Sequence, residues 1–489
     1  MNLLRSKRFH TALFLALVFL SMLLFFTLWH PIPVMDGDDM VCIIRPRPAI
    51  PIPGTWNPSR VLPETLMPLC GALAGLLAGL GCGSFIDCQI FAVAAMLAAF
   101  ITLYIACFLR LLRRRFKLGE LAAFGLAALF LLGHFFVFRS QTEGNLHMFH
   151  CYDCCCVFFY TISALLSCTM VLFFLAEEEP RLFGGGFLRA ALLTTGLYFA
   201  LFSNLFGSSV LAAYAAARVL NTVLRKRPLR ENLLFGGILL AWLFAALIEL
   251  LGGRAESLSG NSSHLLANLA PTWDSFVGLL RTCSPLFLLL FTLSVPAGLV
   301  LLLLRRGGEE RRHFVHCWLT GLFCLACVLP FHLLISAAVT PMYAGRPEAS
   351  FPVFFLVFLL MLLAAAELLR RFPQLAALLP VVLVVSLSMT NSAGRTYADA
   401  NPMGLNGRLV AVIENEMEAQ IRAAVAAGEE TCTVEVLRSD DDWANWPQND
   451  YVGDALAACL YKYGLIERLI PVEAVPSDAY NLRYGVPLP

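Results

Sequence analysis

The chain has 489 residues, of which 59 % are hydrophobic and 14 % are charged, and its mean hydropathy is +0.74. Soluble globular proteins are less apolar than this, so the composition excludes that class and predicts a polytopic membrane protein. The formal net charge of +1 gives no basis for expecting a nucleic-acid partner.

Long apolar runs recur along the first 390 residues, and a helix needs about 20 such residues to cross a membrane. By this criterion we expect about eleven transmembrane helices. Residues 66–83 are also apolar, but they are short and rich in glycine, so they either span the membrane or re-enter it from one side. The expected spans are residues 9–29, 85–109, 121–138, 154–176, 192–203, 205–224, 233–251, 275–304, 314–339, 351–369 and 373–389.

One cluster of basic residues precedes the first expected span, and each of the other clusters follows a span that is expected to end on the inner side. Because basic loops stay in the cytoplasm, they predict a multi-pass protein of the cytoplasmic membrane with its N-terminus inside and residues 391–489 outside. The first apolar run resembles a signal peptide, but it is too long and no small-residue cleavage pattern follows, so we expect an uncleaved anchor. The clusters are Arg5, Lys7 and Arg8, then residues 110–117, 225–227, 305–312 and 370–371.

Residues 391–489 have a different pattern from the rest of the chain. Residues 414–427 show helical periodicity, residues 431–437 alternate as a strand does, and Gly428 lies between them as a helix stop. The fold prediction is an α-helical polytopic membrane protein. Residues 1–390 form its transmembrane domain, with an outer loop at 30–84, and residues 391–489 form a small extracytoplasmic α/β domain.

Three carboxylates lie within four positions of the expected outer loop, at Asp36, Asp38 and Asp39. Asp and Gly are favoured turn formers, so a solvated turn around Gly37 explains the cluster as well as a functional site does. An acidic cluster at a membrane surface can also supply a general base. Alternatively, the oxygens of Asp36, Asp38 and Asp39 can hold Mg²⁺ or Mn²⁺. The sequence leaves these interpretations open.

A carboxylate beside the outer membrane surface suits the transfer of a sugar from a lipid phosphate whose tail lies in the bilayer. The carboxylate would take the proton of the acceptor hydroxyl as that hydroxyl attacks the anomeric carbon. An Arg would neutralise the departing lipid phosphate. Arg346 is the first candidate, with Tyr343 in the same outer loop, 340–350. Arg139 and Arg281 come after it, because snorkelling to the headgroups explains them equally well.

Two further polar features adjoin the expected spans. Glu249 lies in the last turn of its span, where it would pair with Arg254 or remain at the interface. A run of cysteines opens the span 154–176, but neighbouring helical residues point in different directions, which argues against a tetrahedral zinc site. This run consists of His147, His150, Cys151, Asp153, Cys154, Cys155 and Cys156.

Short stretches of the chain resemble known proteins. They are LYFALFSNLFGSSVLAAYAAARVL at 197–220, GRPEASF at 345–351, NGRLVAVIENE at 406–416, DDWANWPQNDY at 441–451 and YKYGL at 461–465. These stretches resemble an uncharacterised bacterial family called domain of unknown function 6056. The order of a first span, an acidic outer loop, further spans and an outer C-terminal domain resembles the GT-C superfamily of glycosyltransferases.

The resemblance implies an inverting transfer from a polyprenyl-phosphate sugar at the outer face, with the acid at Asp36, Asp38 or Asp39. The superfamily generally has one Asp, or an Asp/Glu pair, in this loop, whereas this chain has three. The sequence therefore predicts a glycosyltransferase that acts on a cell-surface glycan or lipid acceptor, surrounded by membrane lipids.

Two other functions fit the sequence. One is a flippase or transporter of a polysaccharide precursor, and the other is a non-catalytic partner subunit whose tail binds a wall polymer. A cavity at the outer boundary with Asp38 or Asp39 facing an Arg would favour the enzyme. A continuous polar path across the midplane would favour transport, and a loosely packed outer loop would favour the partner subunit.

Overall fold

The structure is a computed structural model of the whole chain. It describes all residues except 1–5, 35–36, 53–54, 140–145, 150, 152, 178–185, 252–264, 304–308, 391–404, 439–451 and 489. Asp36, His150 and Arg254 therefore lie outside the described residues. Asp38 is described as part of a helix, but its side chain is not.

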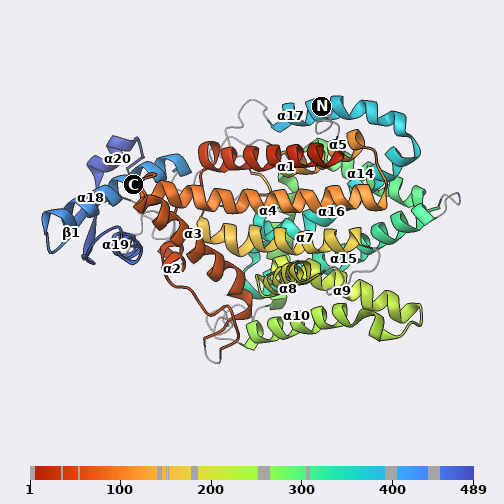
Figure 1. The fold of residues 1–489 in the computed structure, drawn as a ribbon, viewed down its shortest axis with the longest axis horizontal. Coiled ribbons are helices and arrows are strands. Elements are labelled where there is room, and N and C mark those ends of the chain that lie inside the picture. Colours follow the sequence, from red (N-terminus) through yellow and green to blue (C-terminus); the bar gives the residue numbers. More distant parts are fainter. Residues whose placement is uncertain are drawn as a thin grey trace.

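The molecule is a bundle of long apolar helices with a smaller part of helices and strands at one end (Figure 1). Within the described residues, seven helices are long and apolar enough to cross a membrane. This confirms the prediction of a helical membrane protein. The seven are Lys7–Trp29, Pro58–Gly79, Phe85–Arg115, Cys154–Ala176, Pro285–Leu303, Arg311–Val339 and Pro347–Arg371, and shorter apolar helices lie at Glu120–Phe136, Phe187–Leu201, Leu233–Glu249 and Pro373–Met389.

The elements up to residue 390 follow the expected apolar runs in order. They are α1 (Lys7–Leu24) with its π-helical continuation η2 (Phe25–Trp29), α2 (Gly37–Ile44), η3 (Pro58–Arg60), α3 (Val61–Gly79), α4 (Phe85–Arg115), α5 (Glu120–Phe136), α6 (Cys154–Cys156), η4 (Val157–Ile162), α7 (Ser163–Ala176), α8 (Phe187–Leu201), α9 (Leu205–Leu224), η5 (Leu229–Asn232), α10 (Leu233–Leu251), α13 (Leu265–Thr282), α14 (Pro285–Leu303), α15 (Glu309–Val339), η6 (Pro341–Gly345), α16 (Pro347–Arg371), η7 (Pro373–Leu378) and α17 (Leu379–Thr390).

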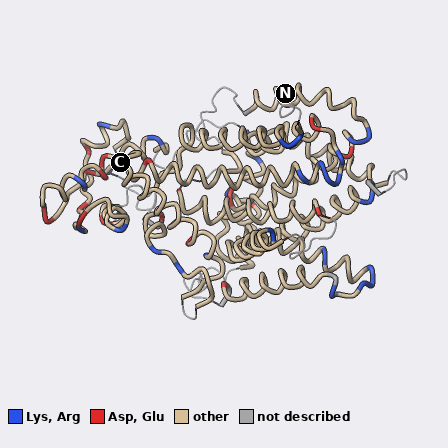
Figure 2. Tube along the Cα trace, viewed as in Figure 1, with Lys and Arg blue, Asp and Glu red and all other residues tan. Residues whose placement is uncertain are grey.

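The bundle has two chemically different ends. At one end, His10 of α1 lies 3.0 Å from Glu120 of α5, and Arg114 of α4 lies 2.8 Å from Glu177, just after α7. We call this the basic end, because most Lys and Arg of the bundle gather there (Figure 2), at residues 110–115, 225–227, 311–312 and 370–371. The opposite end, where residues 405–438 and 452–488 lie, is called the tail end.

The sequence predicts one span over residues 275–304, and a helix long enough to span is found there, but it begins later, at Pro285. Two helices, α13 and α14, meet there. A residue before proline is disfavoured in helical geometry, so the helix breaks ahead of Pro285. The hydroxyl of Ser284 then accepts the N–H of Phe287 at 3.2 Å and starts α14. Cys283 in the break forms an antiparallel bridge with Phe138.

Two further expectations concern loops at the tail end. The segment 66–83 belongs to a helix of 22 residues, Pro58–Gly79, which is long and apolar enough to cross a membrane. The helix α1 ends and α4 begins at the same end of the bundle (Figure 1). The chain therefore enters and leaves the segment that contains Pro58–Gly79 at one end of the bundle, without passing to the other end. The outer loop expected at 340–350 is shorter than predicted, because α16 already begins at Pro347, a residue suited to the first helical position.

The C-terminal part contains α18 (Gly407–Ala427), β1 (Cys432–Leu437), α19 (Val452–Lys462), β2 (Val472–Ser477) and α20 (Asp478–Tyr484). The two strands pair in parallel, with Cys432 opposite Val472. The predicted helix and strand are confirmed here, and Gly428 ends α18 with a φ of +79°. The helix itself starts earlier than expected, because Asn406 caps it by accepting the N–H of Leu409 at 3.0 Å.

The C-terminal part is joined to the bundle by specific hydrogen bonds. The buried carboxylate of Glu418 on α18 accepts the N–H groups of Phe85 and Ile86, at 3.0 and 3.1 Å, and so caps the start of α4. The hydroxyl of Tyr463, just after α19, donates to the carbonyl of Ile43 at 2.9 Å. The bonds of Glu418 join α18 to α4. The bond of Tyr463 holds α2, and therefore the Asp-containing loop, against the C-terminal part.

Candidate functional site

The polar groups of the tail end gather around the first turns of the helix that begins at Cys154. Asp153 caps this helix, and its Oδ1 accepts the N–H of Cys156 at 2.5 Å. The next turn, Val157–Ile162, is π-helical. Such π-helical turns are rare in proteins, and those that occur often lie at functional sites. They widen the helix and redirect its side chains.

Asp39 of α2 points at this helix start. Its side chain is fully buried, and its two oxygens accept the N–H groups of Cys155 at 2.5 Å and Cys154 at 3.1 Å. The first N–H groups of a helix have no partner within the helix and carry partial positive charge, so a carboxylate is well placed there. The structure therefore gives Asp39 a capping role that the sequence did not suggest.

This arrangement bears on the proposed Mg²⁺ or Mn²⁺. The oxygens of Asp39 face the positive end of a helix and already accept two N–H groups, which is a poor environment for a cation. Among the described residues, no group of three or more His, Cys, Asp or Glu side chains can hold a metal ion. The donor set that is described does not fit a divalent metal, and we derive no step through one.

Arg346 lies between η6 and α16, near the same helix start. Its guanidinium carbon is 5.1 Å from the ring centroid of Tyr343, and that ring is 6.1 Å from the ring of Tyr160 on η4. Glu348, in the first turn of α16, is only 7 % exposed. Burial lowers the pKa of Arg346, but the charge of Glu348 and the neighbouring thiol and phenol groups outweigh it, so the net pKa is raised.

The buried thiol of Cys151 lies in the same environment. Burial raises its pKa well above the usual value, and the negative charge of Glu348 raises it further. Its sulfur is 3.2 Å from the hydroxyl of Thr161 on η4. Arg346, Tyr343 and Tyr160 therefore lie near one another beside the π-helical turn, and the charge of the buried Glu348 acts on Arg346.

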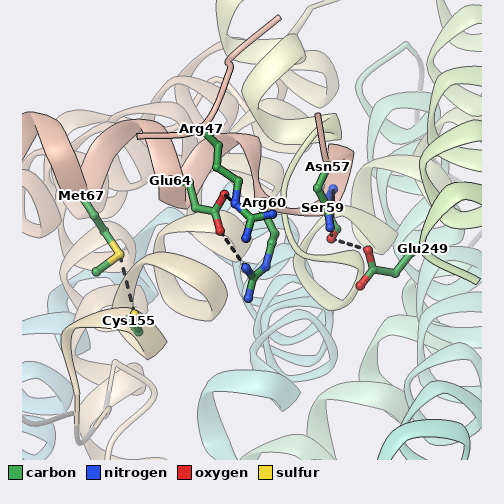
Figure 3. Close-up of polar contacts among 8 residues, drawn as sticks. All are labelled: Arg47, Asn57, Ser59, Arg60, Glu64, Met67, Cys155 and Glu249. Atoms are coloured by element: carbon green, nitrogen blue, oxygen red, sulfur yellow. Dashed lines mark hydrogen bonds and ion pairs between the residues drawn. The ribbon is translucent and has the colours of Figure 1, made fainter. Parts of the chain in front are cut away.

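A second ionic group lies on α3, close to the other side of this turn (Figure 3). The buried carboxylate of Glu64 pairs with Arg47 and Arg60, each at 2.8 Å. The guanidinium of Arg60 also lies over the ring of Phe159, 5.3 Å from its centroid. Farther along α3, the thiol of Cys155 contacts Met67. Two cations on one buried carboxylate leave this group with a net positive charge.

Glu249 has a different partner from the one that the sequence suggests. The hydroxyl of Ser59 donates to Glu249 Oε2 at 2.6 Å, which joins the end of α10 to η3 (Figure 3). Asn57 Oδ1 accepts the backbone N–H of Ser59 at 3.0 Å and lies 2.9 Å from the same hydroxyl oxygen. The expected partner, Arg254, is outside the described residues.

The two other candidate arginines do not join the group around Arg346. Arg139 and Arg281 both have exposed side chains. They lie at the break between α13 and α14, where the N–H of Arg139 donates to the carbonyl of Thr282 at 2.8 Å. Their exposure fits the interpretation that they reach the headgroup region. Among the described residues, Arg346 is the one of the three arginines that is under the influence of a buried carboxylate, that of Glu348.

The cysteine-rich run does not gather into a metal centre among the described residues. His147 is fully buried in an aromatic group, 5.0 Å from the ring of His30 and 5.4 Å from that of Phe135. Cys154 and Cys155 instead supply backbone N–H groups to Asp39. The side chains of the run therefore serve separate contacts.

Neither of two cavities lined by described residues is lined by Asp39 or Arg346. The larger, of about 1090 Å³, lies at the basic end. The smaller, of about 430 Å³, lies between α1, α4 and α18, with Asp87 and Arg408 among its lining residues. The expected cavity in which an Asp faces Arg346 is thus not one of these two.

Comparison with protein-family models finds no match to the chain, and comparison with curated proteins finds none either. The resemblance to GT-C glycosyltransferases therefore stays a prediction from short stretches and from the order of the spans.

The sequence reasoning missed Glu348, Glu64 and the pair Arg47 and Arg60 as parts of polar groups. A usable signal existed for Glu348, because it follows Arg346 by two residues at the start of an apolar helix, where an ionisable side chain is costly. No such signal existed for Arg47 and Arg60. They are 13 residues apart in the chain, and only the fold brings both to Glu64.

Proposed function

We propose that this protein is an integral-membrane glycosyltransferase of GT-C type. It would transfer a sugar from a polyprenyl-phosphate donor to a cell-surface glycan or lipid acceptor at the tail end of the bundle. The observation that supports this best is the group of Arg346, Tyr343 and Glu348 beside the π-helical turn, with Asp39 at the start of the same helix. A cation and carboxylates close together are what this transfer requires.

The proposed chemistry balances without a cofactor. The acceptor hydroxyl gives its proton to a carboxylate as its oxygen forms a bond to the anomeric carbon, and the bond from that carbon to the phosphate oxygen breaks. The lipid phosphate leaves with the electron pair, and Arg346 neutralises it with its planar fork of N–H donors. Asp38 or Asp39 is the proposed base, with Asp36 as an alternative, and Glu348 is a further carboxylate within the group.

The arrangement of the helices is compatible with the proposed topology. Eleven of the described helices, from α1 to α17 without α2, α3, α6 and α13, match the order of the expected spans. If the basic end faces the cytoplasm, as basic residues generally do, the tail end faces outward. We therefore propose a multi-pass protein of the cytoplasmic membrane with residues 391–489 outside.

The packing of the Asp-containing loop argues against one competing function, and the position of the ionic groups argues against the other. Asp39, Met40 and Ile43 are all buried, so this part of the outer loop is tightly packed, which argues against the partner-subunit function. A transporter would place its ionisable groups at the membrane midplane, whereas the groups around Arg346 and Glu64 lie toward the tail end.

The proposal is tested with the purified chain in liposomes that contain radiolabelled polyprenyl-phosphate sugars, offered one at a time, with a membrane extract as the source of acceptors. We expect label to move from the donor to the acceptor with at least one sugar. Arg346→Lys, which keeps the charge but loses the fork, should lower this rate by at least about tenfold. Arg139→Lys, the matched change at an exposed arginine, should leave the rate unchanged.

Absence of transfer with every donor, in protein shown to be folded, would contradict the proposed function. Normal transfer by Arg346→Lys would show that transfer occurs without this arginine. If no transfer occurs with any donor, movement of the intact lipid-linked sugar between leaflets in a vesicle assay would support the transporter.

A further inference from the structure

A second cationic feature lies at the opposite end of the molecule from the candidate site. A cavity of about 1090 Å³ opens between the ends of α4 and α9 and the start of α15. Among the described residues that line it, none is acidic and eight are Arg or His. These eight are Arg115, Arg218, Arg225, Arg227, Arg311, Arg312, His313 and His316.

Positive charge at a cytoplasmic membrane surface is ordinary, but elsewhere at the basic end it is matched by acids. Arg114 and Arg110 pair with Glu177. Arg370 and Arg371 pair with Glu367, which is fully buried. The cavity brings six arginines to one open volume, among them Arg218 and Arg311. Like charges held together repel one another unless an anion is present.

Hydrogen bonds within the protein fix part of the cavity wall. Arg115 is only 6 % exposed, and its Nε donates to the carbonyl of Leu175 at 2.9 Å. Its Nη1 lies 3.2 Å from Nδ1 of His313. These contacts fix the guanidinium of Arg115 and the imidazole of His313 as neighbours at the base of the cavity.

Two other arginines are positioned but keep donors without a hydrogen-bond partner. The guanidinium of Arg218 lies over the ring of Phe235, 5.0 Å from its centroid. Arg311 donates from Nη2 to the carbonyl of Leu302 at 2.7 Å. In both, Nε is buried and makes no hydrogen bond to another described residue. A buried N–H without an acceptor is costly, so an anion that supplies the acceptor would stabilise both side chains.

We infer that this cavity binds an anion that carries a phosphate group with at least two negative charges. The planar guanidinium groups match phosphate oxygens, and several of them reach one volume. Basic pockets between helices on the cytoplasmic side are suited to phosphate-containing lipid headgroups. The inference does not depend on sugar transfer at the tail end.

The border of the cavity indicates where such a ligand would come from. Leu220, Leu224 and Leu319 line it and have exposed side chains. At the surface of a membrane helix, exposed leucines contact acyl chains, so a lipid could place its phosphate among the arginines and its tails along these leucines. A soluble diphosphate would use the same arginines without the leucines.

The test uses the full-length purified chain in nanodiscs. One arm adds phosphatidic acid to a phosphatidylcholine bilayer and counts the acidic lipid retained per protein by native mass spectrometry. The other arm titrates inorganic pyrophosphate into phosphatidylcholine nanodiscs by calorimetry. We expect saturable binding in at least one arm, with the lipid arm reporting a headgroup ligand and the pyrophosphate arm a soluble one.

Paired variants show whether the cavity is responsible. Arg218→Gln combined with Arg312→Gln should weaken binding by at least about tenfold, since each hydrogen bond to a charged group is worth about a factor of ten or more. Lys226→Gln combined with Arg230→Gln removes the same charge from exposed residues at the same end that do not line the cavity. This control pair should bind like the unmodified protein.

Arg312→Gln alone provides a readout if the double variant does not fold, because the side chain of Arg312 is exposed and its loss should not disturb packing. A several-fold loss of affinity in this variant supports the inference. Absence of binding in both arms, unchanged binding in Arg312→Gln and the double variant, or an equal loss in the control pair would overturn it.

Discussion

Replacement of Asp39 by Asn tests whether its carboxylate mainly holds the helix start. The carboxylate is fully buried and accepts two backbone N–H groups, those of Cys154 and Cys155. Asn keeps one acceptor oxygen, but its amide nitrogen cannot accept, so one N–H is left unsatisfied at a cost of about 1–3 kcal/mol. The lost attraction between a negative charge and the helix start adds up to about 2 kcal/mol. We therefore expect Asp39→Asn to lower the free energy of unfolding by about 2–4 kcal/mol.

The measurement is the midpoint of denaturant-induced unfolding in detergent micelles, followed by tryptophan fluorescence. Asp87→Asn is the matched control. Asp87 is also in the first turn of a helix, but it is exposed and accepts from Asn415 at 2.9 Å, so its change should cost no more than about 0.5 kcal/mol. An unchanged midpoint for Asp39→Asn would refute the capping argument. If sugar transfer were lost at that unchanged midpoint, Asp39 would act as a catalytic carboxylate instead.

Three further predictions concern packing, an ion pair and orientation. Gly207→Ala should destabilise the protein by about 1–3 kcal/mol, because the added carbon would lie 2.8 Å from the backbone nitrogen of Ala164; Gly236→Ala, which meets nothing within 4 Å, should be neutral or slightly stabilising in the same unfolding assay. Glu64→Gln should lower the free energy of unfolding by about 2–4 kcal/mol, since it leaves two arginines without their shared carboxylate; an unchanged unfolding midpoint would show that solvent screens the pair. Cys82, which is exposed at the tail end, should react with a membrane-impermeant maleimide added outside intact cells, and labelling only after the cells are opened would reverse the proposed orientation.

Much of the bundle can be predicted from the sequence because the residues that start, extend and end each helix lie within it or next to it. The segment Leu233–Leu251 begins and ends where its apolar run does. The break between α8 and α9 falls at Asn204, whose side chain accepts the N–H of Phe206 at 2.8 Å. Gly428 ends α18 because its φ of +79° is easily adopted only by glycine. Hydropathy, caps and stops of this kind depend on neighbours within a few residues.

Some boundaries were mispredicted because they depend on distant contacts. The apolar run at 275–304 contains no charged residue between Thr282 and Leu303, so hydropathy alone joins it into one span. The break is stabilised by the bridge between Cys283 and Phe138, and the N–H of Ser284 donates to the carbonyl of Val137 at 2.7 Å. A sequence pattern does not reveal a partner that is more than a hundred residues away.

The sequence by itself determined the membrane class, the order of the helices and the gathering of basic residues at one end of the bundle. Each of these follows from local composition. Only the tertiary structure decided what each ionisable residue contacts. Asp39 became a cap of a helix that starts 115 residues later, Arg346 came to lie beside Tyr343 and Glu348, and Arg218 and Arg311 came to line one cavity. The physical reason is that the hydropathy of each segment decides whether it enters the membrane. A buried charge, in contrast, is stabilised only by the particular partners that the packed helices bring to it.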